Sequence, residues 1–224
     1  RDRFTVCLSS DWRNYQEMSA ERSGQTISKL FEVYYDIVFA ELARAAPSGR
    51  YYADWTADEM LVIFYGDSEE ERKMVMREAL AFTRVLASEI PERVKSEMGL
   101  TLKYDVGLAA GTGYLGLQGP SERRKTTIAG EVPGTAKRLE TEAKELRARG
   151  FDSDYPNVIM DAAVSEAAVA SHFFDSGWHS EFVAGTKNVA GMKVTLWRCM
   201  GEAQNTLLRL ATGDRSNQPP VAAA

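Results

Sequence analysis

Apolar residues recur along the chain with two different periods, which predict helices and strands. Between residues 23 and 45 seven apolar positions follow the three-and-four spacing of one helix face, and Pro47-Ser48-Gly49 ends that helix. Ser68 begins a capping-box pattern and a helix that we expect to run to about Met98, kinked or interrupted at Pro91. Two further helices are predicted over 134–150 and 161–171.

Short runs rich in β-branched and aromatic residues predict the strands. They cover residues 3–9, 50–55, 60–64, 102–111 and 158–160, and a C-terminal pair at 182–184 and 193–197. Residues 56–59 form a tight hairpin turn, and the glycines between 111 and 119 indicate a second hairpin or a bulged strand. The order β-α-ββ-α-β-β-α-β-α-ββ predicts an α+β or α/β sandwich in which helices cover a mixed sheet.

Composition and charge narrow the class of protein. Of the 224 residues, 44% are hydrophobic and 26% charged, which is typical of a globular domain with a sizeable core. We expect one domain over 1–200 and an extension over 201–224 with a flexible end. The net charge of −5 disfavours non-specific binding to nucleic acid. No apolar run approaches the ~20 residues that cross a membrane, and we see no signal peptide.

The few cysteines and histidines limit redox and metal chemistry. Cys7 and Cys199 lie in apolar, strand-like segments, which predicts buried thiols in a cytoplasmic protein. His172 and His179 are too few for a histidine-rich metal site.

Two carboxylates hold suggestive positions. Asp11 follows the first predicted strand, and Asp58 lies in the turn of the next hairpin. If these elements are neighbours, both side chains point into one open site, and such a pair suits Mg²⁺ or Mn²⁺ carrying a phosphate substrate. In two-metal sites the ions lie about 3.5–4 Å apart and stabilise the attacking and leaving oxygens. Aspartate is also a common turn residue, so this pair by itself does not establish a metal site.

Five segments carry the most specific signal in the sequence. They are SDWRNYQEMS at 10–19, WTADEMLVIF at 55–64, a glycine-rich run at 106–116, IAGEVPGTAKRL at 128–139 and KNVAGMKVTLW at 187–197. In order and spacing they resemble the metal motifs, dimer-arm strand, Asn-x-Ala-x-Arg helix start and closing hairpin of class III nucleotidyl cyclase catalytic domains. The resemblance covers about residues 4–197, and five weak motifs in register make it specific.

The resemblance implies a fold and a set of site residues. The fold would be the ferredoxin-like, palm-type α+β sandwich of this family, acting as a homodimer with active sites at the interface. Asp11, Asp58 and the backbone carbonyl of Trp12 match the ligands of two divalent cations, Mg²⁺ or Mn²⁺. Arg138 matches the arginine that stabilises the transferring phosphate, and Lys187 the lysine that holds the terminal phosphates. Arg138 and the base pocket would come from the partner subunit.

The base-reading position departs from the purine cyclases. Four residues before Asp58, adenylate cyclases of the family have Lys and guanylate cyclases Glu, whereas this chain has Asp54. An ionised Asp54 can only accept hydrogen bonds, which disfavours ATP and suits uracil N3–H, the cytosine amine or guanine N1–H. Tyr52 lies two positions earlier on the same strand face and Tyr51 adjoins it, so the pocket is crowded. Thr127 holds the second base-reading position, where its hydroxyl can donate or accept.

Further departures bear on activity. Gly134 replaces the family Asn that orients ribose and phosphate, and Ala57 and Pro133 also differ from the pattern. The combination resembles the stand-alone bacterial pyrimidine cyclases of Pycsar anti-phage defence. That resemblance implies conversion of the nucleoside triphosphate UTP to 3′,5′-cyclic UMP and diphosphate, with the product read by a downstream effector. The alternatives are CTP to cyclic CMP, then an adenylate or guanylate cyclase, then a catalytically silent dimerisation or sensing module.

Overall fold

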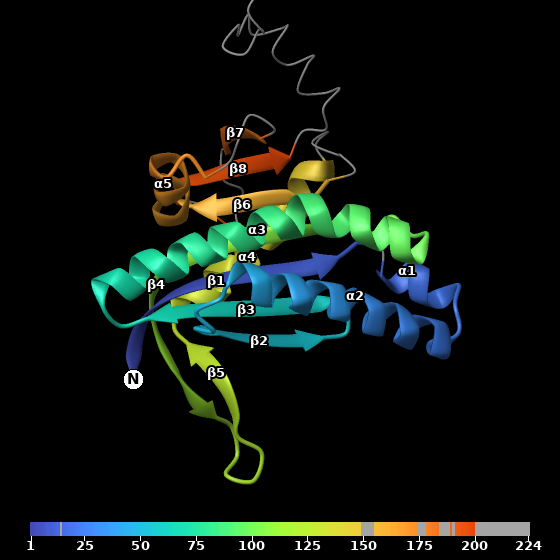
Figure 1. The fold of residues 1–224 in the computed structure, drawn as a ribbon, viewed down its shortest axis with the longest axis horizontal. Helices are drawn as coiled ribbons and strands as arrows, with labels where there is room; N and C mark the ends of the chain where they lie inside the picture. The colour runs from blue at the N-terminus through green and yellow to red at the C-terminus, as the bar shows by residue number, and fades with distance from the viewer. Residues whose placement is uncertain (14, 149–154, 174–177, 184–188, 190, 200–224) are drawn as a thin grey trace, which may run out of the picture.

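A mixed eight-stranded sheet forms the centre of the molecule (Figure 1). The computed structural model describes residues 1–13, 15–148, 155–173, 178–183, 189 and 191–199, so the extension predicted at 201–224 lies outside the described residues. The strand order is β2-β3-β1-β4-β6-β8-β7, with β5 paired to β4. β4 and β6 run parallel, and the other pairs are antiparallel. The strands are β1 (Asp2–Trp12), β2 (Tyr51–Thr56), β3 (Glu59–Gly66), β4 (Tyr104–Gln118), β5 (Lys125–Ala129), β6 (Asn157–Asp161), β7 (Trp178–Val183) and β8 (Val194–Cys199).

Helices cover both faces of this sheet. They are α1 (Tyr15–Ala20), α2 (Gly24–Ala45), α3 (Glu69–Met98), α4 (Glu131–Ala148) and α5 (Ala162–Ala170). α2 and α3 pack against each other over one face, whereas α4 lies over β1, β4 and β6 on the other (Figure 1). Among the described helices, none is long and apolar enough to cross a membrane. The mixed sheet with helices on it confirms the predicted fold class.

Strand side chains alternate between two apolar layers, because successive side chains of a strand point to opposite faces. In β1, Val6, Leu8 and Trp12 belong to the layer under α2 and α3, whereas Cys7 belongs to the layer under α4. Asp11 lies four positions after Cys7, an even number, so its side chain points to the same face of the sheet, the one under α4. Cys7 is a buried free thiol, as predicted, and the side chain of Cys199 lies outside the described residues.

α3 runs without a break from its capping box to Gly99. The Ser68 hydroxyl accepts from the Glu71 amide, the Glu71 carboxylate accepts from the Ser68 amide, and Gly99 ends the helix in the left-handed conformation. The predicted interruption at Pro91 is wrong, because the helix continues on both sides of it. Ile90 is fully buried beside the proline, and this packing holds the helix despite the lost backbone hydrogen bond.

The helices α4 and α1 also differ from the predictions. α4 begins at Glu131, three residues before the predicted start, because Pro133 lies in the first turn, where a missing N–H costs nothing. The short helix α1 was not predicted, since its six residues include no buried side chain and give no periodic apolar signal.

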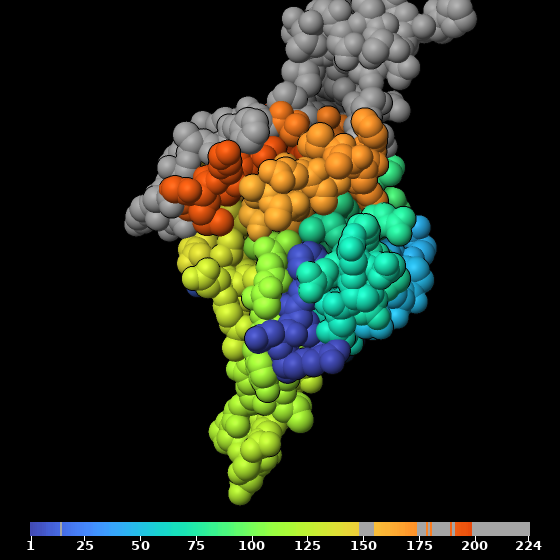
Figure 2. All heavy atoms as spheres, turned by 90° about the vertical axis from the view of Figure 1, so that its left-hand side faces the viewer, coloured from blue at the N-terminus to red at the C-terminus, as the bar shows by residue number. Residues whose placement is uncertain are grey.

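β4 and β5 form a hairpin arm that projects from the body of the molecule (Figures 1 and 2). β4 is one continuous strand whose first half is buried in the sheet and whose second half forms the arm. The hairpin, rather than a bulged strand, is therefore the correct alternative for the glycine-rich segment. Tyr114 and Leu117 are exposed on the arm.

Candidate active site

Asp11 and Asp58 meet at one end of β1. Asp11 is the penultimate residue of the strand, and the Trp12 amide donates to the Asp58 carbonyl at 3.2 Å, which fixes the β2–β3 turn against the strand. Burial raises the pKa of Asp58 to about 6, and the hydrogen bond with Asp11 adds to the effect. Burial would also raise the pKa of Asp11, but the Lys144 ammonium beside it lowers that pKa below its ordinary value. The two carboxylates thus lie side by side, and each affects the pKa of the other.

The turn that carries Asp58 is held from the α2 side. The Tyr35 hydroxyl donates to the Ala57 carbonyl at 2.7 Å. Ala57 has φ 53°, a left-handed conformation that costs alanine about 1–2 kcal/mol and accounts for the glycine that the resembled family has here. The Trp12 indole packs against Phe31, with ring centroids 4.9 Å apart, so it is the backbone of Trp12 that lies beside the turn.

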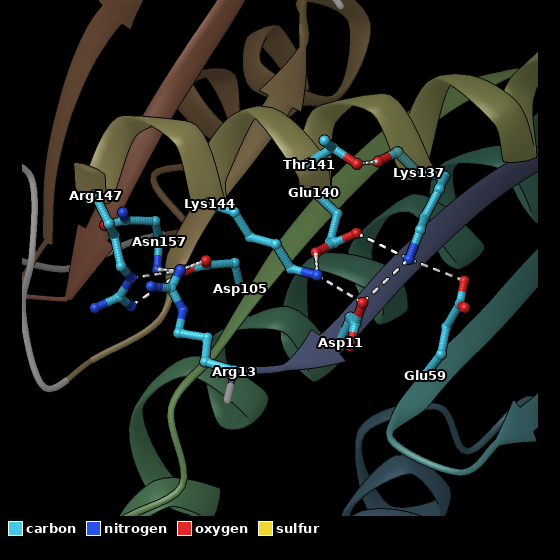
Figure 3. Close-up of polar contacts among 10 residues, drawn as sticks. All are labelled: Asp11, Arg13, Glu59, Asp105, Lys137, Glu140, Thr141, Lys144, Arg147 and Asn157. Carbon is cyan, nitrogen blue, oxygen red and sulfur yellow. Dashed lines mark hydrogen bonds and ion pairs between the residues drawn. The ribbon is translucent and has the colours of Figure 1, made fainter. Parts of the chain in front are cut away.

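One face of α4 places three charged side chains over Asp11 (Figure 3). The Lys144 ammonium lies 2.6 Å from Asp11 Oδ2, and the Lys137 ammonium lies 3.4 Å from the same oxygen and 3.0 Å from Glu59. Glu140 is fully buried between the lysines, 3.1 Å from Lys137 and 2.9 Å from Lys144. Sequence reasoning did not single out these residues. Their i, i+3, i+7 spacing on one helix face was the available signal.

A second ion cluster lies along the same helix (Figure 3). The buried Asp105 carboxylate accepts from Arg147 Nε and Nη2 at 3.1 Å and from the Asn157 amide at 3.1 Å, and it also forms an ion pair with Arg13. Arg147 Nη2 further donates to the Tyr155 carbonyl at 2.7 Å. This cluster joins β1, β4, α4 and β6, and thereby fixes α4 above the aspartates.

The residues predicted to read the base divide between the two faces of β2. Tyr52 packs against the layer under α4, and Asp54 shares its parity, whereas Tyr51 packs against the layer under α2 and α3. The structure therefore does not bring Tyr51 together with Tyr52 and Asp54. Asp54 accepts from the Lys125 ammonium of β5 at 2.5 Å, and Thr127 lies two residues further on β5, on the same face as Lys125. Lys125 was missed by sequence reasoning.

A cavity of about 200 Å³ lies along the β2–β3 hairpin, where Trp55 forms part of its wall. Its lining includes Asp54, Thr56, Glu59 and Leu61. A larger cavity of about 630 Å³ lies between α2 and the other side of the hairpin, where Trp55 lines it. The smaller cavity is the one next to the acidic residues, because Glu59 in its wall pairs with the Lys137 ammonium, which also pairs with Asp11.

The two predicted phosphate-binding residues do not join Asp11 within the described part of this chain. Arg138 is exposed on α4, and its guanidinium donates to Thr135 Oγ1 at 2.9 Å. It lies one residue, or about 100° of helix rotation, from Lys137, which faces the aspartates. Lys187 lies outside the described residues.

The donor set at the aspartates fits a hard cation. In the described ranges, no group of three or more His, Cys, Asp or Glu side chains could hold a metal ion. Asp11 and Asp58 nevertheless supply two carboxylates next to backbone oxygens. Mg²⁺ is commonly bound by one or two carboxylates together with substrate phosphates, so this set suits it.

Comparisons with known proteins give similarity in three dimensions. No protein-family model and no curated protein matches the sequence. The adenylyl cyclase CyaB from P. aeruginosa is similar with TM-score 0.67 and 13% identity, covering 91% of this chain and 97% of that one. The guanylyl cyclase Cya2 is similar with TM-score 0.61 and 19% identity, and the match covers 90% of this chain and 95% of that one.

A third solved structure comes from a fungus. It is a non-canonical dimeric guanylyl cyclase domain of the RhoGC fusion protein from Blastocladiella emersonii, with TM-score 0.63 and 15% identity, covering 88% of this chain and 97% of that one. At such identities the likeness concerns the fold. The chain has the class III nucleotidyl cyclase fold that its motifs predict.

Proposed function

We propose that the protein is a nucleotidyl cyclase that converts a nucleoside triphosphate to a 3′,5′-cyclic monophosphate and diphosphate. The observation that carries this proposal is the Asp11–Asp58 pair, which the hydrogen bond from the Trp12 amide to the Asp58 carbonyl brings together at the end of β1, in a sheet with the cyclase fold. Asp11, Asp58 and the Trp12 carbonyl would hold two divalent cations, Mg²⁺ or Mn²⁺. When bound, these cations supply charge neutralisation of the triphosphate and activation of the ribose 3′-hydroxyl.

The remaining chemistry falls to side chains of the protein. The 3′-oxygen forms a bond to the α-phosphorus, the bond to the bridging oxygen of the diphosphate breaks, and the hydroxyl proton passes to solvent. Arg138 from the second protomer stabilises the charge on the transferring phosphate, and Lys187 holds the terminal phosphates.

We propose UTP as the preferred substrate. The Asp54 carboxylate can accept the uracil N3–H, and the Lys125 ammonium at 2.5 Å from it can donate to a neighbouring uracil carbonyl. Tyr52 lies on the same strand face and narrows the space for a two-ring base. CTP is the second candidate, because the same pair offers an acceptor for the cytosine amine and a donor for its N3. Cyclic UMP would serve as a second messenger in anti-phage signalling, read by an effector protein.

The proposed enzyme is a homodimer. Arg138 is exposed and lies about 100° of helix rotation from Lys137, and the β4–β5 arm presents Tyr114 and Leu117 to solvent. Exposed apolar side chains on a projecting arm are typical of an interface. A second protomer would place its own Arg138 at the Asp11–Asp58 pair.

The test is incubation of the purified chain with ATP, GTP, CTP and UTP in turn, in the presence of Mn²⁺, followed by mass analysis of the products. We expect cyclic UMP as the main product, its loss in Asp58→Ala, and its retention in Glu70→Ala, which removes an exposed carboxylate from the first turn of α3. A cyclic purine product would contradict the pyrimidine preference but would support the proposed cyclase activity. No product from any of the four would favour the silent module.

A further inference from the structure

The Asp11 carboxylate already has two cationic partners from its own chain. Lys144 lies 2.6 Å and Lys137 3.4 Å from Oδ2 of Asp11, a carboxylate that would hold a divalent cation (Figure 3). Both ammoniums come from α4, which the Asp105 cluster fixes to the sheet. A cation that binds Asp11 would therefore lie beside these ammoniums and compete with them for the carboxylate.

The lysines are held in place and are not simply solvated helix side chains. About 60% of each lysine side chain is covered, since the exposed fractions are 39% for Lys137 and 36% for Lys144. Glu140 lies between them with an exposed fraction of 0% and forms an ion pair with each. Because Glu140 stays bound to both ammoniums, a lysine that leaves Asp11 keeps one carboxylate partner, and its displacement costs less than the loss of a whole ion pair.

The charges of the cluster have the right balance for this exchange. The carboxylates of Asp11, Glu59 and Glu140 form ion pairs with the two ammoniums, and the Asp58 carboxylate lies beside Asp11. The carboxylates outnumber the ammoniums, so the cluster has a net negative charge that attracts a divalent cation. An ammonium only a few ångströms from that cation repels it strongly, because partly buried charges are poorly screened.

We infer that Lys144, assisted by Lys137, is an internal counter-ion of Asp11 that competes with the divalent cation and so sets the cation concentration at which the site fills. This inference rests on the proposed function, because it takes Asp11 as a cation ligand. It adds a positioning role for two α4 lysines to which the sequence motifs assign no function. If the Lys144–Asp11 pair served stability alone, removal of the charge would weaken the fold without tightening cation binding.

The experiment measures binding of Mn²⁺ alone to the full chain, from the electron paramagnetic resonance signal of free Mn²⁺. Lys144→Met should lower the dissociation constant at least about fivefold, the size of a typical coupling between neighbouring charges. Lys144→Arg keeps the charge and should stay within about twofold of the parent. Lys73→Met removes a lysine paired with Glu69 on the exposed face of α3 and should also leave the constant unchanged.

A second readout covers the case in which Lys144→Met folds poorly. Lys144→Gln and Lys137→Met are made in parallel, and the rise in melting temperature on addition of Mn²⁺ is measured for each. We expect a larger rise in these variants than in the parent, since the cation replaces the missing counter-charge.

Asp11→Asn separates the two proposals. If Mn²⁺ binds and Asp11→Asn abolishes binding, but no charge-removing lysine variant binds Mn²⁺ more tightly, the counter-ion inference is wrong and the proposed metal site stands. If the parent does not bind Mn²⁺ through Asp11, the metal site of the proposed function is wrong, and the inference falls with it.

Discussion

At the scale of single residues, the site owes its properties to neighbours that are distant in the sequence. Asp105 carries no sequence signal of function, yet it is fully buried with Arg147 and Arg13 as charged partners. A buried ion cluster adds little net stability as a whole, but removal of one charge leaves the others uncompensated. The cluster is therefore where single substitutions should have their largest effect on stability.

We expect Asp105→Asn to lower the free energy of unfolding by about 3–5 kcal/mol, because it removes the buried carboxylate that pairs with both Arg147 and Arg13. Urea denaturation followed by circular dichroism measures the change. Asp67→Asn is the matched control, since Asp67 forms ion pairs with Arg1 and Arg3 at the surface and should cost less than about 1 kcal/mol. Equal effects of the two substitutions would contradict the assignment.

Ala57→Gly should stabilise the protein by up to about 1 kcal/mol, because it removes the left-handed strain at Ala57 while the glycine loses more chain entropy on folding. The same denaturation experiment detects it. Ala53→Gly in the interior of β2 is the control and should be destabilising. A residue in a strand interior has no left-handed strain to relieve, so glycine there only costs chain entropy. A loss of stability in Ala57→Gly would show that the turn carries no strain.

The Cys7 thiol should be unreactive in the folded protein. Burial raises the pKa of Cys7 to about 12, so the reactive thiolate is almost absent at neutral pH and appears only as the pH approaches that value. In a Cys199→Ser background, a thiol reagent such as DTNB should label Cys7 only after unfolding in urea. Rapid stoichiometric labelling of the native protein near neutral pH would contradict this prediction.

At the scale of elements, the close approach of α4 to β4 positions the charged face of the helix. A side-chain Cβ at Gly107 would lie 2.1 Å from the Ala136 carbonyl oxygen and 2.4 Å from the Glu140 amide nitrogen. Gly134, in the same helix, has open space around it. The two glycines thus serve different purposes: Gly107 is required by packing, whereas Gly134 is a departure from the family that the fold does not require.

A pair of alanine substitutions tests this difference. Gly134→Ala should raise the free energy of unfolding by about 0.5–1 kcal/mol, because alanine has the higher helix propensity. Gly107→Ala should lower it by about 3 kcal/mol, at the upper end of the cost of overpacking. Urea denaturation of both variants gives the comparison. Destabilisation by Gly134→Ala would mean that the start of α4 needs a glycine.

Periodicity predicted most elements, because long amphipathic helices and alternating strands carry their signal locally. It failed at α1, which buries no side chain, and at Pro91, where tertiary packing overrides the local preference. For the site, the motifs indicated Asp11 and Asp58, and the structure brings them together. Lys125 and the lysines of α4 were missed, since their roles come from contacts across more than 70 positions of the chain.

At the scale of the whole molecule, the proposed active site needs two chains. Asp11, one of the carboxylates proposed to hold the cations, lies under one face of α4, and Arg138 is exposed on another. In a closed twofold dimer each protomer can supply Arg138 to its partner's aspartates, which gives two equivalent sites.

Mixing of inactive variants tests this arrangement. Asp11→Asn and Arg138→Ala should each abolish cyclase activity, and co-refolding them should restore up to about a quarter of it, because half of the random dimers then contain one intact site of two. Asp11→Asn mixed with Asp58→Ala should restore nothing, since both changes affect the same half-site. Recovery in this control mixture, or none in the first, would contradict a shared site.

The acidic residues of three neighbouring strands have a consequence for folding. Asp11 lies directly opposite Glu59 on one side and Asp105 on the other, and together they form an anionic row beneath the cationic side chains of α4. If β1 slipped by one residue, Asp11 would enter the aromatic layer where Trp12 belongs, and the indole would face the lysines. The charges of the candidate site therefore also discriminate against misaligned sheets, so that a chain with an incorrect strand alignment lacks both its core and the candidate site.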